Sequence, residues 1–176
     1  MSKASYILRL TVILFLITAV VAALLGGINY MTADKIAQIT KEKTDAAMSA
    51  VLPADTYTEQ DFSDDTGLVD TVYQAGDDGY VVQTTVSGSQ GMITLMVGID
   101  NDGVVTGISI IDQAETPGLG AVYADQSARG VAFRDSFVGL SGGVATTDVE
   151  AISGATVSAT AICQGVSAAT ACVGAR

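Results

Sequence analysis

The sequence predicts an α+β fold, in which a single N-terminal transmembrane helix is followed by a curved antiparallel sheet with helices packed against it. An uncharged apolar run lies near the N-terminus, short β-branched runs separated by glycine and aspartate fill the middle of the chain, and helical patterns flank those runs. With 176 residues, the chain has room for one membrane helix and one compact domain.

The membrane helix is predicted from Leu10 to Ile28, where no charged residue occurs. A helix of about 19 residues is about 28 Å long, which matches the hydrocarbon core of a bilayer. A cleaved signal peptide is the alternative, but its apolar region is typically about 7–15 residues long and ends at a small-residue cleavage site, and neither condition is well met. Positive charges before and after the run are nearly balanced, so charge alone does not orient the span.

A second helical stretch, Asn29 to Val51, is expected to form a stalk that leads into the domain and stops at Pro53. Its candidate buried positions are Ile36, Ile39, Ala46, Ala47 and Ala50. The acidic, turn-rich residues 54–67 are expected to be a loop with one short strand. The chain is thereby divided into an N-terminus at 1–9, the span at 10–28, the stalk and linker at 29–53, and one domain at 54–176.

Four β-branched runs make up the predicted sheet. They are residues 68–75, 80–86, 92–99 and 104–111, with GDDG, SGSQG and DNDG between them. Because glycine and aspartate suit tight turns between neighbouring strands, an antiparallel meander is expected. The DNDG segment is expected to be a hairpin turn, since it lacks the glycine and glutamate that a calcium loop needs at its sixth and twelfth positions.

Two helices are expected after the sheet. Residues 125–138 carry Phe133 and Phe137, whose spacing favours core packing on one helix face. The last helix is expected at 158–173, with Ser158 as its N-cap residue. Both helices would pack against the sheet.

Charge and residue content exclude several functions. The net charge is −11, and no Lys or Arg occurs between Lys43 and Arg129, so a nucleic-acid surface, which needs clustered cations, is excluded. The chain has no His, so nothing supports metal ligation or a Cys–His nucleophile. Cys163 and Cys172 lie nine positions apart on the last predicted helix, about 13 Å, which is too far for a disulfide. Both are expected to be small core residues.

The segment ETPGLG, residues 115–120, directly follows the fourth predicted strand. Pro117 presets its φ and Gly118 supplies a positive φ, as a type II turn requires, so a tight turn is the simplest interpretation. Gly120 would also permit the backbone to approach a flat group closely.

The segment EAISGATVS, residues 150–158, ends at the start of the last predicted helix. Small residues and hydroxyls there leave backbone N–H groups for an anion at the positive end of the helix dipole. On spacing alone, an ordinary capped helix start explains the segment as well. Neither a GxxxxGKS/T nor a GxGxxG motif occurs, so a phosphate here would not lie in a nucleotide-hydrolase loop.

Behind one membrane helix, the order and spacing of ETPGLG and ISGATVS resemble the FMN-binding domain family, and most closely the G subunits of Rnf electron transport complexes. The resemblance covers nearly the whole chain. It implies that a flavin transferase joins the phosphate of FMN to the hydroxyl of Thr156. The family usually has Asp six positions before this threonine, where the present chain has Glu150.

The resemblance also implies roles for individual residues. The residues that the transferase would recognise are Glu150, Ser153, Gly154, Ala155 and Thr156. Ser153, Gly154 and Ala155 would also contribute to cofactor binding. The expected neighbours of the flavin ring are Thr116, Leu119 and Gly120. Glu115 is transferred only as a loop residue without an assigned role.

The implied function is that of a membrane-anchored electron-transfer subunit with covalently bound FMN. Its complex would couple electron transfer between ferredoxin and NAD to Na⁺ or H⁺ translocation, with the integral membrane and peripheral subunits of the Rnf complex as partners. The implied location is the cell (inner) membrane, crossed once, with the N-terminus in the cytoplasm and the FMN domain outside it. Because the flavin performs the redox chemistry, no catalytic acid, base or nucleophile is predicted.

Two alternatives stay open at this point. The C subunit of the sodium-pumping NADH:quinone oxidoreductase has the same anchor and attachment segment, although its chains are generally longer. A cofactor-free anchored domain that binds a partner would keep the span, the sheet and the acidic surface, and both motifs would then be plain turns.

Overall fold

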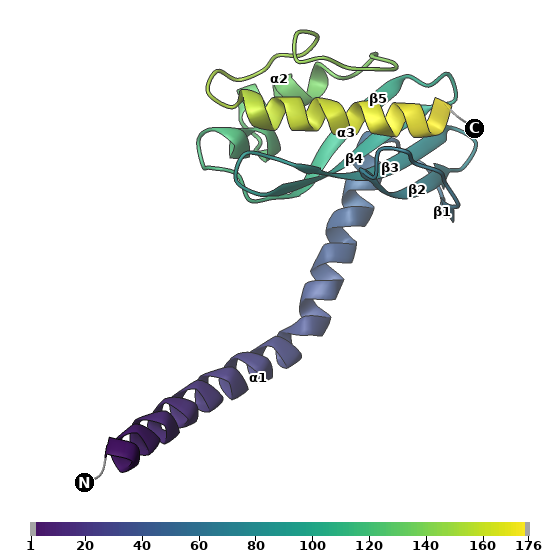
Figure 1. The fold of residues 1–176 in the computed structure, drawn as a ribbon. Coiled ribbons are helices and arrows are strands. Elements are labelled where there is room, and N and C mark those ends of the chain that lie inside the picture. The colour runs from purple at the N-terminus through teal and green to yellow at the C-terminus, as the bar shows by residue number, and fades with distance from the viewer. Residues whose placement is uncertain (1–2, 175–176) are drawn as a thin grey trace. The chain divides into compact units, whose positions relative to one another are not determined.

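The computed structural model describes residues 3–174, with side chains from residue 7 onward, and has the predicted α+β class (Figure 1). The chain consists of two units, which meet between Glu42 and Lys43. Its elements in chain order are α1 (Lys3–Val51), β1 (Tyr57–Gln60), β2 (Val69–Ala75), β3 (Gly79–Ser87), β4 (Met92–Asp100), β5 (Val105–Gln113), the 3₁₀ helix η1 (Gly120–Ala124), α2 (Ala128–Asp135) and α3 (Thr156–Gly174).

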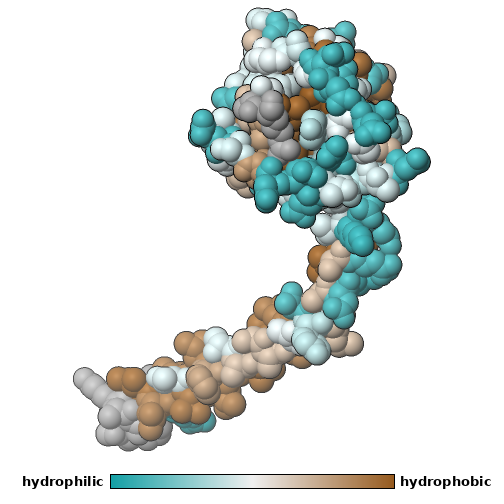
Figure 2. All heavy atoms as spheres, turned by 90° about the vertical axis from the view of Figure 1, so that its right-hand side faces the viewer, coloured by the Kyte–Doolittle hydropathy of each residue, from teal (hydrophilic) through white to brown (hydrophobic). Residues whose placement is uncertain are grey.

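Helix α1 is long and apolar enough to cross a membrane. Its apolar part has a mean hydropathy of 2.6 with none of its residues buried, and Figure 2 shows apolar side chains along its N-terminal part. The hydroxyls of Thr11 and Thr18 donate to the carbonyls of Ile7 and Leu14 one turn earlier, both at 3.0 Å, so neither needs water as a partner. Helix α3 is also long and apolar, but it is mostly buried, as a core helix of the domain is.

The predicted stalk is not a separate element, because α1 continues unbroken from Lys3 to Val51. The predicted burial along it is wrong at four positions. Ile36, Ile39, Ala46 and Ala50 are exposed, whereas Ala47 is buried as expected. Ala47 lies in the last turns of α1, which pack on the sheet, and Met48, Val51 and Leu52 are buried there with it.

The sheet is the expected antiparallel meander, with strand order β1-β2-β3-β4-β5. The short strand expected within residues 54–67 is β1, at the sheet edge beside β2. The DNDG segment forms the predicted hairpin turn between β4 and β5. There, the carboxylate of Asp100 accepts the backbone N–H groups of Asp102 and Val104 at 3.0 and 2.9 Å, and Gly103 has a φ of 78°.

Helix α3 covers one face of the sheet and forms the main core with it (Figure 1). Ile162 and Val166 on the helix are fully buried in this core, together with Val82 and Leu95 of the strands. Gly165 allows the close approach, because a Cβ there would lie only 3.0 Å from the Thr84 hydroxyl oxygen. Cys163 and Cys172 are buried here, as expected of small core residues.

The last turns of α1 pack on the opposite face of the sheet, since strand neighbours such as Val81 and Val82 point to opposite sides and Val81 belongs to the α1 cluster. Gly98 and Gly107 are paired across β4 and β5 and have no side chains to keep the end of α1 away from the sheet. We call this pair the glycine saddle. A Cβ at Gly98 would lie 2.5 Å from the Val51 carbonyl oxygen. The Thr106 hydroxyl donates to the same oxygen at 2.6 Å.

Both predicted helix boundaries after the sheet need correction. Helix α2 is shorter than residues 125–138, because the Ser127 hydroxyl accepts from the Gly130 N–H and caps the helix at that point. Helix α3 begins at Thr156, two residues earlier than expected. Ser158 is therefore not the N-cap residue but lies within the first turn.

The aromatic pair predicted for the core is confirmed. Phe133 and Phe137 are fully buried and meet edge to face with their ring centroids 5.1 Å apart. A third ring, Tyr123 of η1, lies 4.0 Å from Phe133. This cluster sets the position of the chain segment that leads into α3.

Candidate functional site

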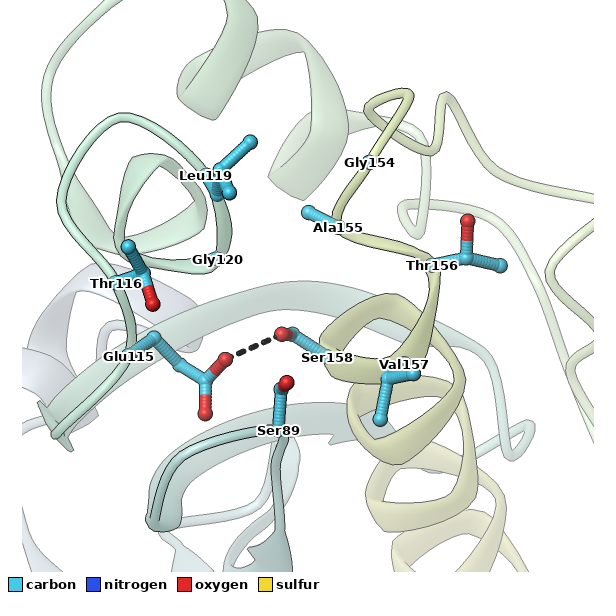
Figure 3. A pocket seen from close by; sticks show the side chains of 10 residues that line it. All are labelled: Ser89, Glu115, Thr116, Leu119, Gly120, Gly154, Ala155, Thr156, Val157 and Ser158. Atoms are coloured by element: carbon cyan, nitrogen blue, oxygen red, sulfur yellow. Dashed lines mark hydrogen bonds between the residues drawn. The ribbon is translucent and has the colours of Figure 1, made fainter.

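A cleft of about 260 Å³ lies where the ETPGLG segment meets the start of α3 (Figure 3). The turn between β3 and β4 closes its third side. The lining residues are Ser89, Glu115, Thr116, Leu119, Gly120, Gly154, Ala155, Thr156, Val157 and Ser158. The fold thus brings together two segments that are more than 30 positions apart in the chain.

The ETPGLG segment forms the tight turn that its sequence predicts. The Leu119 N–H donates to the Thr116 carbonyl at 3.1 Å, and Gly118 has a φ of 80°. The turn leaves the Leu119 side chain 42 % exposed on the wall of the cleft, facing Ala155 (Figure 3). A Cβ at Gly154, whose φ is 86°, would lie 3.4 Å from a Leu119 methyl group, so the two motifs meet here.

Thr156 is the first residue of α3 and is exposed. Its side chain points away from Glu115 and Ser158 at the edge of the cleft (Figure 3). The first N–H groups of any α-helix lack partners within the helix, and the helix dipole places a partial positive charge beside them. The Thr156 hydroxyl therefore lies where a negatively charged group is favoured.

Two hydrogen bonds with Tyr123 hold the segment before Thr156 in place. Its buried hydroxyl accepts the Ile152 N–H at 2.9 Å and donates to the Ala155 carbonyl at 3.2 Å. Burial raises the pKa of this phenol, so it keeps its proton and can donate. Arg134 donates to the Tyr123 carbonyl at 2.5 Å and to the Asp125 carbonyl at 2.9 Å, so its guanidinium fixes η1.

Glu115 is the residue of the cleft whose importance the sequence did not reveal. Its side chain is only 7 % exposed, and its carboxylate accepts the Gln90 N–H at 2.9 Å and the Ser158 hydroxyl at 2.5 Å. Burial alone would raise its pKa, but these bonds and those from Gly91 and Ser89 together lower it. The side chain is thus a carboxylate at neutral pH.

Ser153 and Glu150 lie apart from the cleft. They line a second, more open cavity of about 410 Å³, together with Ala128, Arg129, Ala132, Ala151 and Ile152. The Glu150 N–H donates to the Ser136 hydroxyl at 3.2 Å, while its side chain is exposed. Of the predicted cofactor-binding residues, the structure therefore brings six into one cleft and separates Ser153 from them. The six are Thr116, Leu119, Gly120, Gly154, Ala155 and Thr156.

The cleft suits a flat, partly exposed aromatic group joined to an anion. Leu119 and Val157, which are 42 % and 61 % exposed, offer apolar surface at its rim, and the α3 N-terminus offers N–H groups for a phosphate. Its volume of about 260 Å³ lies below the roughly 300–1,000 Å³ of pockets that enclose a whole ligand, so an edge of a flavin would stay accessible. The residues present thus fit FMN.

Comparison with known proteins agrees with this geometry. A family model described as the FMN-binding domain matches residues 88–171, which include the whole cleft. The G subunit of the ion-translocating oxidoreductase complex of Methanosarcina acetivorans is 33% identical over 92% of this chain and 92% of its own length. This chain belongs to the family of G subunits of ion-translocating oxidoreductase complexes. The expected resemblance and the expected cofactor, FMN, are thereby confirmed.

Two further G subunits are similar to this chain, one over most of its length and one over about half. The G subunit of the Na(+)-translocating ferredoxin:NAD(+) oxidoreductase complex of Acetobacterium woodii is 33% identical over 91% of this chain and 88% of its own length. The G subunit of the proton-translocating ferredoxin:NAD(+) oxidoreductase complex of Clostridium ljungdahlii is 36% identical over 49% of each chain. Family membership supports an electron-transfer flavoprotein subunit that works with other subunits of a complex, and with the apolar α1 it indicates association with a membrane.

Three residues were not predicted to line the cleft. Ser89 lies in the turn between β3 and β4, Val157 directly follows Thr156, and Ser158 was assigned only to helix capping. Ser89 lies in the SGSQG turn, outside the two segments that carry the family resemblance. Pairing of β3 with β4 is what carries it to the cleft.

Proposed function

We propose that this chain carries FMN bound covalently through a phosphoester to the Thr156 hydroxyl. The observation that carries the proposal is the place of Thr156, exposed at the first position of α3 and on the edge of a cleft that fits a flavin ring. A phosphodiester retains one negative charge, which the N-terminus of a helix stabilises by about 0.3–1 kcal/mol. The covalent tether also removes the association cost of holding the cofactor.

Residues from each wall of the cleft would contact or position the bound FMN. Leu119 and Val157 pack against the ring, and the turn at Thr116 holds Leu119 in position. Gly120 lets the backbone approach Glu115 and Ser158 closely, because a side chain there would collide with both. Bound FMN supplies the redox chemistry, and the protein fixes its position and surroundings.

We further propose that the complex transfers electrons between ferredoxin and NAD and couples this to ion translocation. The support is the function that the names of the relatives state, since two of them belong to ferredoxin:NAD(+) oxidoreductase complexes. Because one of these translocates Na⁺ and the other protons, membership alone does not select the ion. The G-subunit relatives favour this proposal over the C subunit of the sodium-pumping NADH:quinone oxidoreductase.

For the membrane arrangement, we propose that α1 crosses the cell (inner) membrane once, with the N-terminus in the cytoplasm and the FMN domain outside. The exposed apolar side chains along the N-terminal part of α1 support a span. In intact spheroplasts, a protease added from outside would then digest the domain, and an undigested domain would contradict this orientation. A flavin transferase that recognises residues 150–156 would attach the cofactor on that side.

Covalent attachment is tested on a denaturing gel. The full chain is expressed with a flavin transferase, and the gel is viewed under ultraviolet light. The wild type and Thr160→Val are expected to give a fluorescent band, and Thr156→Val a dark one. Thr160 is the matched control, because it is an exposed threonine one turn later whose hydroxyl donates to the Thr156 carbonyl. A dark wild-type band, or a fluorescent Thr156→Val band, would refute the attachment.

A further inference from the structure

One buried carboxylate joins all three walls of the cleft. Glu115 precedes the turn at Pro117 and Gly118, accepts the Ser158 hydroxyl of α3 at 2.5 Å, and accepts the Gln90 N–H of the β3–β4 turn at 2.9 Å. The N–H groups of Ser89 and Gly91 add to the same cluster. These bonds connect residues that are 25 and 43 positions away from Glu115 in the chain.

The backbone around Glu115 is shaped to admit this side chain. A Cβ at Gly88 would lie 2.4 Å from one carboxylate oxygen, and a Cβ at Gly120 would lie 2.5 Å from the other. At Gly120 the Ser158 hydroxyl oxygen would also be only 2.6 Å away. Both glycines are therefore needed to surround the carboxylate closely, which indicates that the site is built for Glu115 and does not merely tolerate it.

Neutral side chains would hold these segments together at lower cost, because burying a charged group is unfavourable unless it is fully hydrogen-bonded. The Glu115 carboxylate is hydrogen-bonded, yet the interactions that the structure describes for it are with backbone N–H groups and a neutral hydroxyl. These groups stabilise the negative charge without neutralising it. The charge therefore still acts on whatever occupies the cleft. Charges act more strongly at a partly buried site than in bulk water.

We propose that Glu115 is a positioning residue that locks the three walls of the flavin cleft and lowers the reduction potential of the bound flavin through its charge. The inference rests on the proposed function, since it needs flavin in the cleft. When the ring takes up two electrons from a reductant and one proton from solvent, it gains one negative charge, and a fixed negative charge beside the ring opposes this. The geometry thus favours a flavin that gives up electrons readily.

The test compares four variants of the full chain, loaded with FMN by a transferase and purified in detergent. Glu115→Gln keeps the shape and can still accept the N–H groups, but it removes the charge. Ser158→Ala keeps the charge and removes one hydrogen bond. Glu115→Ala removes both. The matched control is Asp77→Asn, which removes one exposed carboxylate at the opposite end of β3 from the cleft.

The first measurement is the flavin midpoint potential, from absorbance during titration with dithionite and a set of mediator dyes. Glu115→Gln is expected to shift the equilibrium between reduced and oxidised flavin at least tenfold towards reduction, which is about 30 mV for a two-electron couple. Asp77→Asn and Ser158→Ala are expected to stay close to the wild type. A Glu115→Gln potential equal to that of Asp77→Asn would overturn the electrostatic part.

The second measurement is the fluorescence anisotropy of the flavin, which reports how tightly the walls hold the ring. It is expected to fall in Glu115→Ala and in Ser158→Ala and to be retained in Glu115→Gln. Unchanged anisotropy in Ser158→Ala would overturn the positioning part, even if Glu115→Ala fails to fold. A dark wild-type band on the denaturing gel would refute the proposed function instead, so the two failures are distinguishable.

Discussion

The contact between α1 and the glycine saddle predicts a large difference between two apparently equal substitutions. Gly98→Ala would place a Cβ 2.5 Å from both the Val51 carbonyl oxygen and the Thr106 hydroxyl oxygen, which forces the end of α1 away from the sheet. Gly107→Ala, on the paired residue, would bring its Cβ only to 3.3 Å of the Val51 Cα, which a small shift relieves.

The expected loss of folding free energy in Gly98→Ala is the sum of three contributions. Overpacking a well-packed contact costs about 1–3 kcal/mol. Loss of the hydrogen bond from the Thr106 hydroxyl to Val51 would add about 0.5–1.5 kcal/mol. Replacement of a strand glycine returns roughly 0.5–1 kcal/mol through lower unfolded-state entropy. The net destabilisation expected for Gly98→Ala is therefore about 1–3 kcal/mol, and for Gly107→Ala it is less than about 1 kcal/mol.

The assay is urea unfolding of the full chain in detergent, followed by far-ultraviolet circular dichroism. The two variants and the wild type are compared by their transition midpoints, with the slopes checked for equality. Equal midpoints for Gly98→Ala and Gly107→Ala would refute the conclusion that the saddle is fitted to Val51. A lower midpoint for Gly107→Ala than for Gly98→Ala would refute it as well.

Two further predictions concern stability. The hydroxyl of Thr84 is fully buried, with no hydrogen-bond partner among the described residues, so Thr84→Val should raise the free energy of unfolding by about 1 kcal/mol. Thr85→Val, which removes a 2.6 Å bond to Asp70, should not raise it, and a destabilised Thr84→Val variant would contradict the assignment. At Asp64, burial works to raise the pKa, but bonds from the Thr66 hydroxyl and from the N–H groups of Val69, Thr66 and Leu68 lower it from 3.8 to about 2. A carboxyl group whose pKa is lower in the folded than in the unfolded chain stabilises the fold at a pH above its unfolded-state pKa. This stabilisation is lost as the pH falls through the folded-state pKa. At most about 2 kcal/mol of the free energy of unfolding, and less after screening by solvent, should therefore disappear between about pH 4 and pH 2. Acid titration of stability should show this loss in the wild type and a smaller one in Asp64→Asn, and equal curves would contradict it.

Local patterns predicted much of the fold because each depends on neighbours in the chain. The uncharged run at residues 10–28 requires only its own length and composition to be recognised as a helix long and apolar enough to cross a membrane. The β-branched runs and their glycine and aspartate turns likewise predict the meander, with strand ends correct within one or two residues. The turn at Pro117 and Gly118 was predictable for the same reason.

Helix boundaries were harder, because competing local signals decide them. Ser158 has the side chain of an N-cap residue, but its hydroxyl is bound to Glu115, and the helix starts at Thr156 instead. On α1, the spacing of Ile36 and Ile39 is compatible with a buried face, but both side chains are exposed. Whether a side chain is buried depends on the element that packs against it, and the periodicity of one segment gives no information on that element.

By itself, the sequence determined the order of the elements, the long apolar helix at the N-terminal end and the two segments through which a flavin family could be recognised, since these features are written in consecutive residues. Only the tertiary structure decided that Thr116, Leu119 and Gly120 share one cleft with Thr156 while Ser153 and Glu150 do not. It alone revealed Glu115 as the link between three separate segments. The physical reason is that a hydrogen bond across 43 positions depends on how the sheet and α3 pack, and no short stretch of chain specifies that packing.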